Sequence, residues 1–169
     1  MHINAVKILR SKKRRRTVSA RVLKDILIVR APESISESRL QKVITELKAR
    51  IERKHLKDEL NKSEDLAHRA KELSAQYFEN KLSINSIEYV TDQNSKFGCC
   101  NYRTGCIRIS HRISAMPQWV RDYVIIHELA HLEVPDHSKV FWDTVNRYKL
   151  AERARGYLIA VGGLEEQQG

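Results

Sequence analysis

The chain has 169 residues, of which 41% are hydrophobic, so it can bury one sizeable core but is too short for two full-sized domains. Its net charge of +10 is uneven: residues 1–30 hold ten Lys or Arg and one acid, which gives +9. The sequence lacks an apolar run near the about 20 residues that span a bilayer, and its N-terminal charge follows an apolar patch instead of preceding it. We therefore expect a soluble, cytoplasmic protein with no membrane partner and with reduced cysteines.

Residues 1–34 are predicted to form a basic N-terminal β-hairpin region. The stretch "TVSARVLKDILIVRAP" alternates apolar and polar residues, turns at Lys24–Asp25 and stops at Pro32. Just before it, "RSKKRRR" (10–16) is the densest basic run. Such runs bind phosphates by releasing condensed counterions, which makes nucleic acid or a nucleotide a candidate partner. A solvated loop or strand face is the plainer interpretation.

Residues 36–80 are predicted to form a helical region, because apolar side chains recur there with helical spacing. Ser34 or Ser36 can cap its start, and a break is expected near Asn61 before the helix ends at Phe78. The apolar positions on one helix face are Leu40, Val43, Ile44, Leu47 and Ile51.

Residues 83–169 are predicted to form a core that carries the chemistry. "SINSIEYVT" (83–91) and "GCIRIS" (105–110) are typical of strands, and the turn-prone "FGCCNYRTG" between them suggests a second β-hairpin. Pro117 opens a helix that is apolar around most of its circumference, with Ser114 as a possible cap, so this helix should be buried. Two further helices are expected over 138–149 and 150–161. Together these elements predict an α+β fold in a single domain over residues 1–169.

The buried helix contains the motif "HELAHLEVPDH" (127–137). Residues four apart lie one turn above each other on the same helix face, so His127 and His131 can bind one ion. Glu128 lies beside that face. In this arrangement two histidines ligate Zn²⁺ and the glutamate takes a proton from the metal-bound water.

A third ligand is predicted from the proline that follows the helix. Pro135 pushes residue 134 out of the helical region, so the helix should end near Glu133 and the chain should turn back with His137. Three imidazoles and one water form the open four-coordinate site of a catalytic zinc. The ion lowers the pKa of its water from about 15.7 to near 7, which supplies a nucleophile at neutral pH.

Each candidate site also has a plainer interpretation. His127 and His131 could be core histidines beside a chance glutamate, but burying Glu128 without a role costs several kcal/mol. Arg108 and Arg112 could contact substrate, although surface roles are more common for such arginines. A second zinc site is disfavoured, because adjacent cysteines rarely ligate one ion and the spacing fits no common knuckle. Its candidate ligands are Cys99, Cys100, Cys106 and His111.

These motifs support a family resemblance. The segment 95–142, with "SKFGCCNYRTGCIRIS" followed by "HELAHLEVPDHSKVFW", resembles the YgjP-like zincin metallopeptidases, relatives of the SprT-like proteins. In that family a Trp-Gly-Ser-Cys turn and a strand precede the histidine motif, and a His-Ser and a Phe-Trp follow it. This chain departs from the pattern at Phe97, where the family has Trp, and at Cys99, where it has Ser, which puts the substrate preference in doubt more than metal binding.

The resemblance implies a zincin-like fold, a small antiparallel or mixed sheet packed on helices around the central HExxH helix. It also implies that His127, His131 and His137 hold the metal and that Glu128 is the catalytic acid and base. The leading hypothesis is a zinc metallopeptidase acting on peptides or proteins, with the strand of "GCIRIS" as the edge that pairs with substrate. The alternatives are a zinc-dependent nucleoside triphosphate pyrophosphatase and a nucleic-acid-associated SprT-like protease.

Overall fold

The computed structural model describes residues 3–162. The chain divides into two compact units, Met1–Leu56 and Lys57–Gly169. The single domain expected from the sequence over 1–169 stays a prediction. Among the described residues, none of the helices combines the length and the apolar character that crossing a membrane requires.

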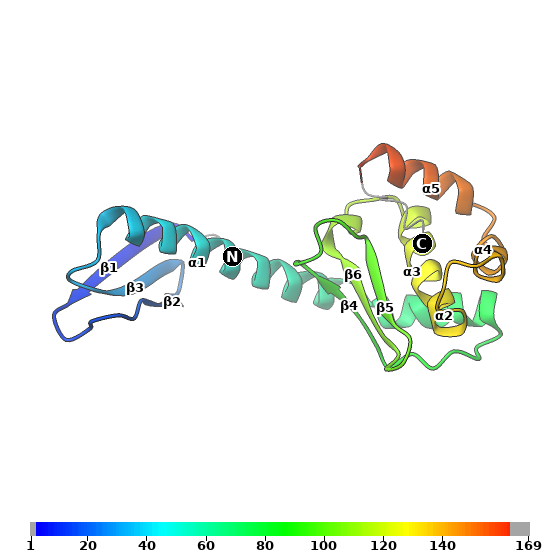
Figure 1. Cartoon of the computed structure of the whole chain (residues 1–169), viewed down its shortest axis with the longest axis horizontal. Coiled ribbons are helices and arrows are strands. Elements are labelled where there is room, and N and C mark those ends of the chain that lie inside the picture. The colour runs from blue at the N-terminus through cyan, green and yellow to red at the C-terminus, as the bar shows by residue number, and fades with distance from the viewer. Residues whose placement is uncertain (1–2, 163–169) are drawn as a thin grey trace. The chain divides into compact units, whose positions relative to one another are not determined.

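The N-terminal unit contains a three-stranded sheet in the order β1-β3-β2 (Figure 1). Its strands are β1 (Ala5–Ser11), β2 (Ser19–Leu23) and β3 (Ile26–Pro32). The antiparallel pairing of β2 with β3 confirms the predicted hairpin, whose turn holds Lys24 at a φ of 52°. Strand β1 was not predicted; it pairs in parallel with β3.

One face of this sheet is covered by helix α1 (Glu37–Ser63). The helix starts after Ser36, whose Oγ accepts a hydrogen bond of 3.4 Å from the Arg39 amide, so this serine is the cap of the predicted pair. The core of the unit is formed by inward-facing side chains of β3 and α1. They are Leu27, Val29, Ala31, Leu40 and Ile44.

The second unit packs a three-stranded sheet against helices. The sheet has the order β4-β6-β5, with β4 (Ser86–Val90), β5 (Gly98–Asn101) and β6 (Cys106–Ser110). The helices that follow the end of α1 are α2 (Leu66–Phe78), the short 3₁₀ helix His111–Ile113, α3 (Gln118–Glu133), α4 (Lys139–Val145) and α5 (Ala151–Ala160). The α1–α2 break lies after Ser63, where the Asp65 carboxylate caps α2 by accepting from the His68 amide at 2.8 Å. The chain therefore has an α+β fold in which small mixed sheets pack on helices.

The second hairpin predicted from the sequence is wrong in its pairing. Strand β4 pairs in parallel with β6, and the antiparallel partner of β6 is β5, which lies inside the segment expected to be only a turn. Ile107 and Ile109 of β6 are fully buried, as expected for a central strand. The strand of "GCIRIS" is therefore not the sheet edge; β4 and β5 are the edges.

Helix α3 is buried along most of its length, as predicted. It ends at Glu133, and Val134 is extended (φ −127°, ψ 98°) ahead of Pro135, which confirms the predicted stop. The expected cap is wrong: Pro117 occupies the N-cap position, whereas Ser114 ends the preceding 3₁₀ helix and donates its hydroxyl to the His111 carbonyl at 2.7 Å.

Candidate metal centre

Three histidines meet at the end of α3. His127 and His131 lie one helical turn apart on α3, and His137 returns from the loop between α3 and α4. One ring nitrogen from each lies within 4.8 Å of the other two, and the Nε2 atoms of His127 and His137 are 3.3 Å apart. Within residues 3–162, no other group of three or more His, Cys, Asp or Glu has this geometry. The structure thus brings together all three histidines singled out from the sequence.

The protonation and spacing of the histidines fit a bound metal ion. Burial, reinforced by the neighbouring imidazoles, lowers the pKa of His127 to about 3, and burial also lowers the pKa of His131 and His137. The rings are therefore neutral at neutral pH, which is the form that binds metal. Two nitrogens bound tetrahedrally to one zinc ion lie about 3.3 Å apart, which is the spacing found between His127 and His137.

The orientation of His131 is set by the backbone that follows the helix. Its Nδ1 lies 3.4 Å from the carbonyl oxygen of Val134, the residue that Pro135 holds in an extended conformation. A donor at Nδ1 leaves Nε2 unprotonated and free to face an ion. Pro135 thus affects two histidines. It turns the chain so that His137 returns to the site, and it places the Val134 carbonyl beside Nδ1 of His131.

Aromatic side chains of α4 hold the imidazoles in place. The ring centroid of Phe141 lies 4.9, 4.5 and 4.7 Å from those of His127, His131 and His137. Trp142 stacks on His137 with centroids 5.5 Å apart and an interplanar angle of 22°. Phe141 is fully buried, so its packing fixes the rotamers of all three histidines.

Glu128 is buried against the edge strand β5. Only 5% of the residue is exposed, and burial raises its pKa to about 8, an effect that the charge of Lys96 opposes. A Cβ added at Gly98 would lie 2.7 Å from both Cγ and Cδ of Glu128 and closer still to Oε1. A side chain at this position would therefore displace the side chain of Glu128 from where it lies.

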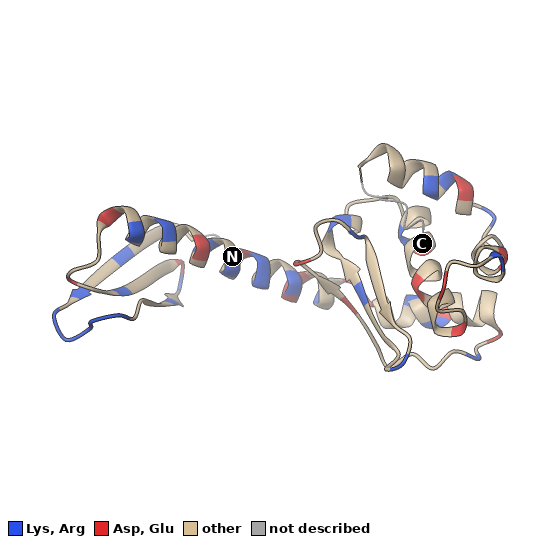
Figure 2. Ribbon diagram, in the orientation of Figure 1, with Lys and Arg blue, Asp and Glu red and all other residues tan. Residues whose placement is uncertain are grey.

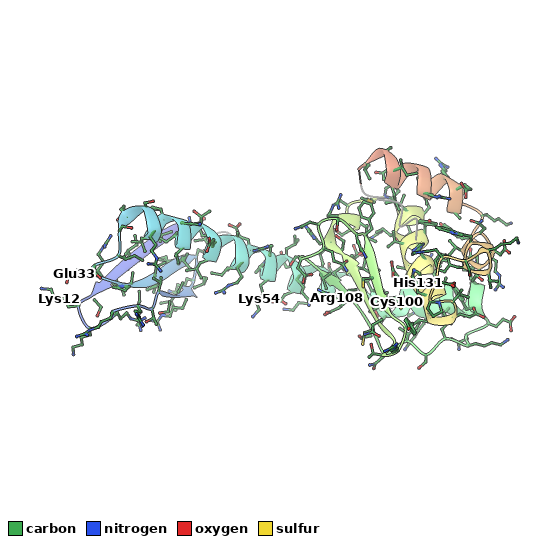
Figure 3. All side chains as sticks on the ribbon, viewed as in Figure 1. Lys12, Glu33, Lys54, Cys100, Arg108 and His131 are labelled. Carbon is green, nitrogen blue, oxygen red and sulfur yellow. The ribbon has the colours of Figure 1, made fainter. Side chains whose placement is uncertain are left out.

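The other residues considered from the sequence lie apart from the histidines or have structural contacts. Arg108, labelled in Figure 3, pairs with Asp92 at 2.7 Å, and both side chains are exposed. Arg112 donates to the Asn94 carbonyl at 2.6 Å. These contacts agree with the surface roles favoured above. The cysteines are free thiols, of which Cys99 is exposed.

Comparison with known proteins gives one family match. The chain matches the YgjP-like metallopeptidase domain over residues 59–152, more than half of its length. The chain belongs to this family. It is therefore a metal-binding hydrolase of the metallopeptidase class, as the motif around the three histidines indicated, and the matched segment contains all three.

Two solved structures are similar to this YgjP-like chain. They are the metallopeptidase zymogens abylysin of Pyrococcus abyssi and jannalysin of Methanocaldococcus jannaschii, which are 19% and 20% identical to it, each with a TM-score of 0.48. The similar regions cover 57% and 58% of this chain, and 91% and 97% of those proteins. No curated protein sequence matches the chain.

Three residues of the site escaped the reasoning from spacing alone. Gly98 lies in a segment with the composition of a turn, and glycine is common in turns whether or not a site lies nearby. Phe141 and Trp142 had the helical spacing of ordinary core residues, and only the family's Phe-Trp pattern set them apart. No local signal shows that Phe141 would touch three histidines, because the contact depends on how α4 folds back.

Proposed function

We propose that this YgjP-like metallopeptidase is a zinc enzyme in which His127, His131 and His137 hold the ion and Glu128 is the general base. The observation that carries the proposal is the meeting of three neutral imidazoles, two of which lie on α3 together with the buried carboxyl group of Glu128. Three nitrogen ligands leave one position of a tetrahedral ion open, as in catalytic zinc sites.

The chain's own groups divide the work of peptide hydrolysis. When bound, zinc lowers the pKa of its water to about 7 and polarises the scissile carbonyl. Glu128, in its ionised form, accepts the proton at a carboxylate oxygen and then delivers it to the leaving amine. A cation near its carboxyl group favours that ionised form, and the charge of Lys96 already acts in this direction.

Strand β5 is the proposed docking edge for the substrate. It lies at the edge of its sheet next to α3, and the backbone at Gly98 lies against Glu128. An extended peptide can add to such an edge through main-chain hydrogen bonds. A peptide bound there would present its carbonyl groups near the base, so β5 takes the role that the sequence had assigned to β6.

The test is hydrolysis of a peptide mixture by zinc-loaded protein and its Glu128→Gln variant. The glutamine keeps the shape of the side chain but cannot accept the proton, so activity should fall by at least the 10²–10⁴-fold typical of general acid–base groups, with zinc still bound. Glu133→Gln is the matched control, since Glu133 ends the same helix but is more exposed than Glu128. Equal activity in both variants would remove Glu128 from its role as base.

A second candidate keeps the zinc and replaces the peptide with a nucleoside triphosphate. It is favoured by two cations near the histidines, because the charge of Lys96 acts on His137 and that of Arg155 on His127. The carboxylate of Asp136 acts on His137 in the opposite sense and more strongly than Lys96. Cations bind phosphate oxygens strongly. Offering nucleoside triphosphates and peptides to the same preparation, with product detection for both, decides between the two substrates.

A further inference from the structure

The N-terminal sheet has one face that α1 does not cover. Side chains alternate between faces along a strand, so residues that neighbour the buried Leu27 and Val29 of β3 point away from the helix. The register places Lys7, Ile28 and Arg21 in one row across the three strands of this open face. The next row is Leu9, Arg30 and Ser19. No acidic residue lies in either row.

The basic run begins with Arg10 at the end of β1 and continues through the loop that leads to β2, shown in blue in Figure 2. Two of its arginines have structural contacts: Arg10 pairs with Glu37 at 2.7 Å, and Arg14 donates to Thr17. The other cations of the loop and those of the open sheet face form what we call the cationic surface. Its members are Lys7, Lys12, Lys13, Arg15, Arg16, Arg21 and Arg30, all exposed.

The side chains of the cationic surface are available to a partner. In the region that the structure describes, none of the seven has a hydrogen-bond or ion-pair partner for its charged group. The nearest acids along the chain are Asp25, in the β2–β3 turn, and Glu33, just after β3. By contrast, the exposed residues of α1 alternate in sign, for example Arg39 and Lys42 with Glu46. The positive charge is thus concentrated on one side of the unit.

The amino-acid composition of the N-terminal unit indicates which class of polyanion the cationic surface could bind. Residues 1–56 contain no Phe, Trp or Tyr. Surfaces that hold single-stranded nucleic acid stack the bases on aromatic rings, and membrane interfaces are enriched in Trp and Tyr. Cations without aromatic partners suit the phosphates of a duplex, because contacts to the backbone do not need the bases.

We propose that the cationic surface binds double-stranded nucleic acid through its phosphates, independently of sequence. Lys7 and Arg21 lie on strands separated by β3, so their Cα atoms are about 10 Å apart. The phosphates of a duplex face each other across grooves about 6 and 12 Å wide, and the Cα distance lies between these two widths. The loop cations extend this surface. The proposal is independent of the peptidase chemistry, since all its residues lie in the unit Met1–Leu56.

The test measures the affinity of the full chain for a short duplex as a function of salt. With all seven cations on phosphates, log Kd should change with log salt with a slope of about 6 for B-DNA. The sheet variant Lys7→Gln/Arg21→Gln/Arg30→Gln should flatten the slope by about 2 to 3. A loop variant that replaces Lys12, Lys13, Arg15 and Arg16 with Gln should flatten it by about 3 to 4.

The matched control removes the same charge from α1, as Arg39→Gln/Lys42→Gln/Arg50→Gln, and should change the slope by less than about one unit. Thermal melting of each variant verifies that it is folded. The affinity of the full chain is measured at equal salt for four ligands: a DNA duplex, an RNA duplex, one of the single strands, and vesicles of anionic phospholipid. Tighter binding to either duplex than to the single strand or the vesicles supports the proposal. Preference for the single strand or the vesicles, or equal slopes in the sheet and control variants, would overturn it.

Discussion

At the residue scale, Gly98 leaves no room for a methyl group. In Gly98→Ala the new Cβ would displace Glu128, because it would lie within 2.7 Å of two of its carbon atoms. We expect kcat/KM to fall by at least about tenfold with the zinc content unchanged, since the base moves and the histidines do not. Gly156→Ala is the control: nothing lies within 4 Å of its added Cβ, and activity should be unaffected. If both alanine variants are fully active, the position of Glu128 does not depend on Gly98.

Because the pKa of Glu128 is raised, the free energy of unfolding of the chelator-treated protein should depend on pH. The folded-state pKa of about 8 lies above the usual 4.5, so the unfolded chain ionises first as the pH rises. Stability from this group is therefore complete below about pH 4.5 and is lost as the pH rises towards 8. A glutamine stays neutral at every pH, so the Glu128→Gln variant should gain a few kcal/mol in free energy of unfolding between about pH 5 and 8 relative to the parent. Urea unfolding at both pH values measures it; parallel profiles would show that the carboxyl is not so strongly desolvated.

At the scale of single elements, local patterns predicted the helices better than the strands. The apolar circumference of α3, its HExxH spacing and the stop before Pro135 depend on neighbours within one or two turns, and the structure shows the same limits. Strands β1 and β5 were not predicted, because their own residues do not show which strands they pair with. In β5, for example, "GCCN" has the composition of a turn, and only pairing with β6 makes it a strand.

Helix α4 should control metal affinity through one ring. Phe141→Leu keeps a buried apolar side chain but removes the ring contacts with the three histidines, so we expect zinc affinity to weaken by about 10–100-fold, as for other groups that orient ligands. Val145→Ala, also fully buried on α4, is the control for lost packing and should leave zinc affinity unchanged. Competition with a zinc chelator measures both. Equal affinities would assign Phe141 to the core alone.

At the scale of the whole molecule, the chain has two separate hydrophobic cores. The core built on β3 and α1 contains residues up to Ile51, and the core around α3 begins at Leu60. The sequence predicted one core, because overall composition and length cannot show that apolar residues divide into two clusters. The cluster of three histidines was predictable, since its members lie within eleven consecutive residues (127–137) of one helix and its following loop.

Two cores predict two unfolding transitions. Zinc bound only by the unit Lys57–Gly169 should raise the midpoint of one transition and leave the other in place. Ile44→Ala, which leaves a cavity in the N-terminal core, should act only on the transition that zinc does not shift. The N-terminal unit should lose about 2–5 kcal/mol in its free energy of unfolding. Calorimetry with and without a chelator measures this. A single transition that shifts as a whole in both experiments would instead show one cooperative domain.

The central claim is that three histidines hold one zinc ion, and metal analysis of the purified protein tests it most directly. We expect one zinc per chain in the parent and in His68→Ala, whose exposed histidine lies on α2. In His127→Ala, His131→Ala and His137→Ala the zinc retained after dialysis should fall far below one per chain, because each loss leaves only two ligands. Stoichiometric zinc in any of these three variants, or a parent protein that binds no zinc, would contradict the account.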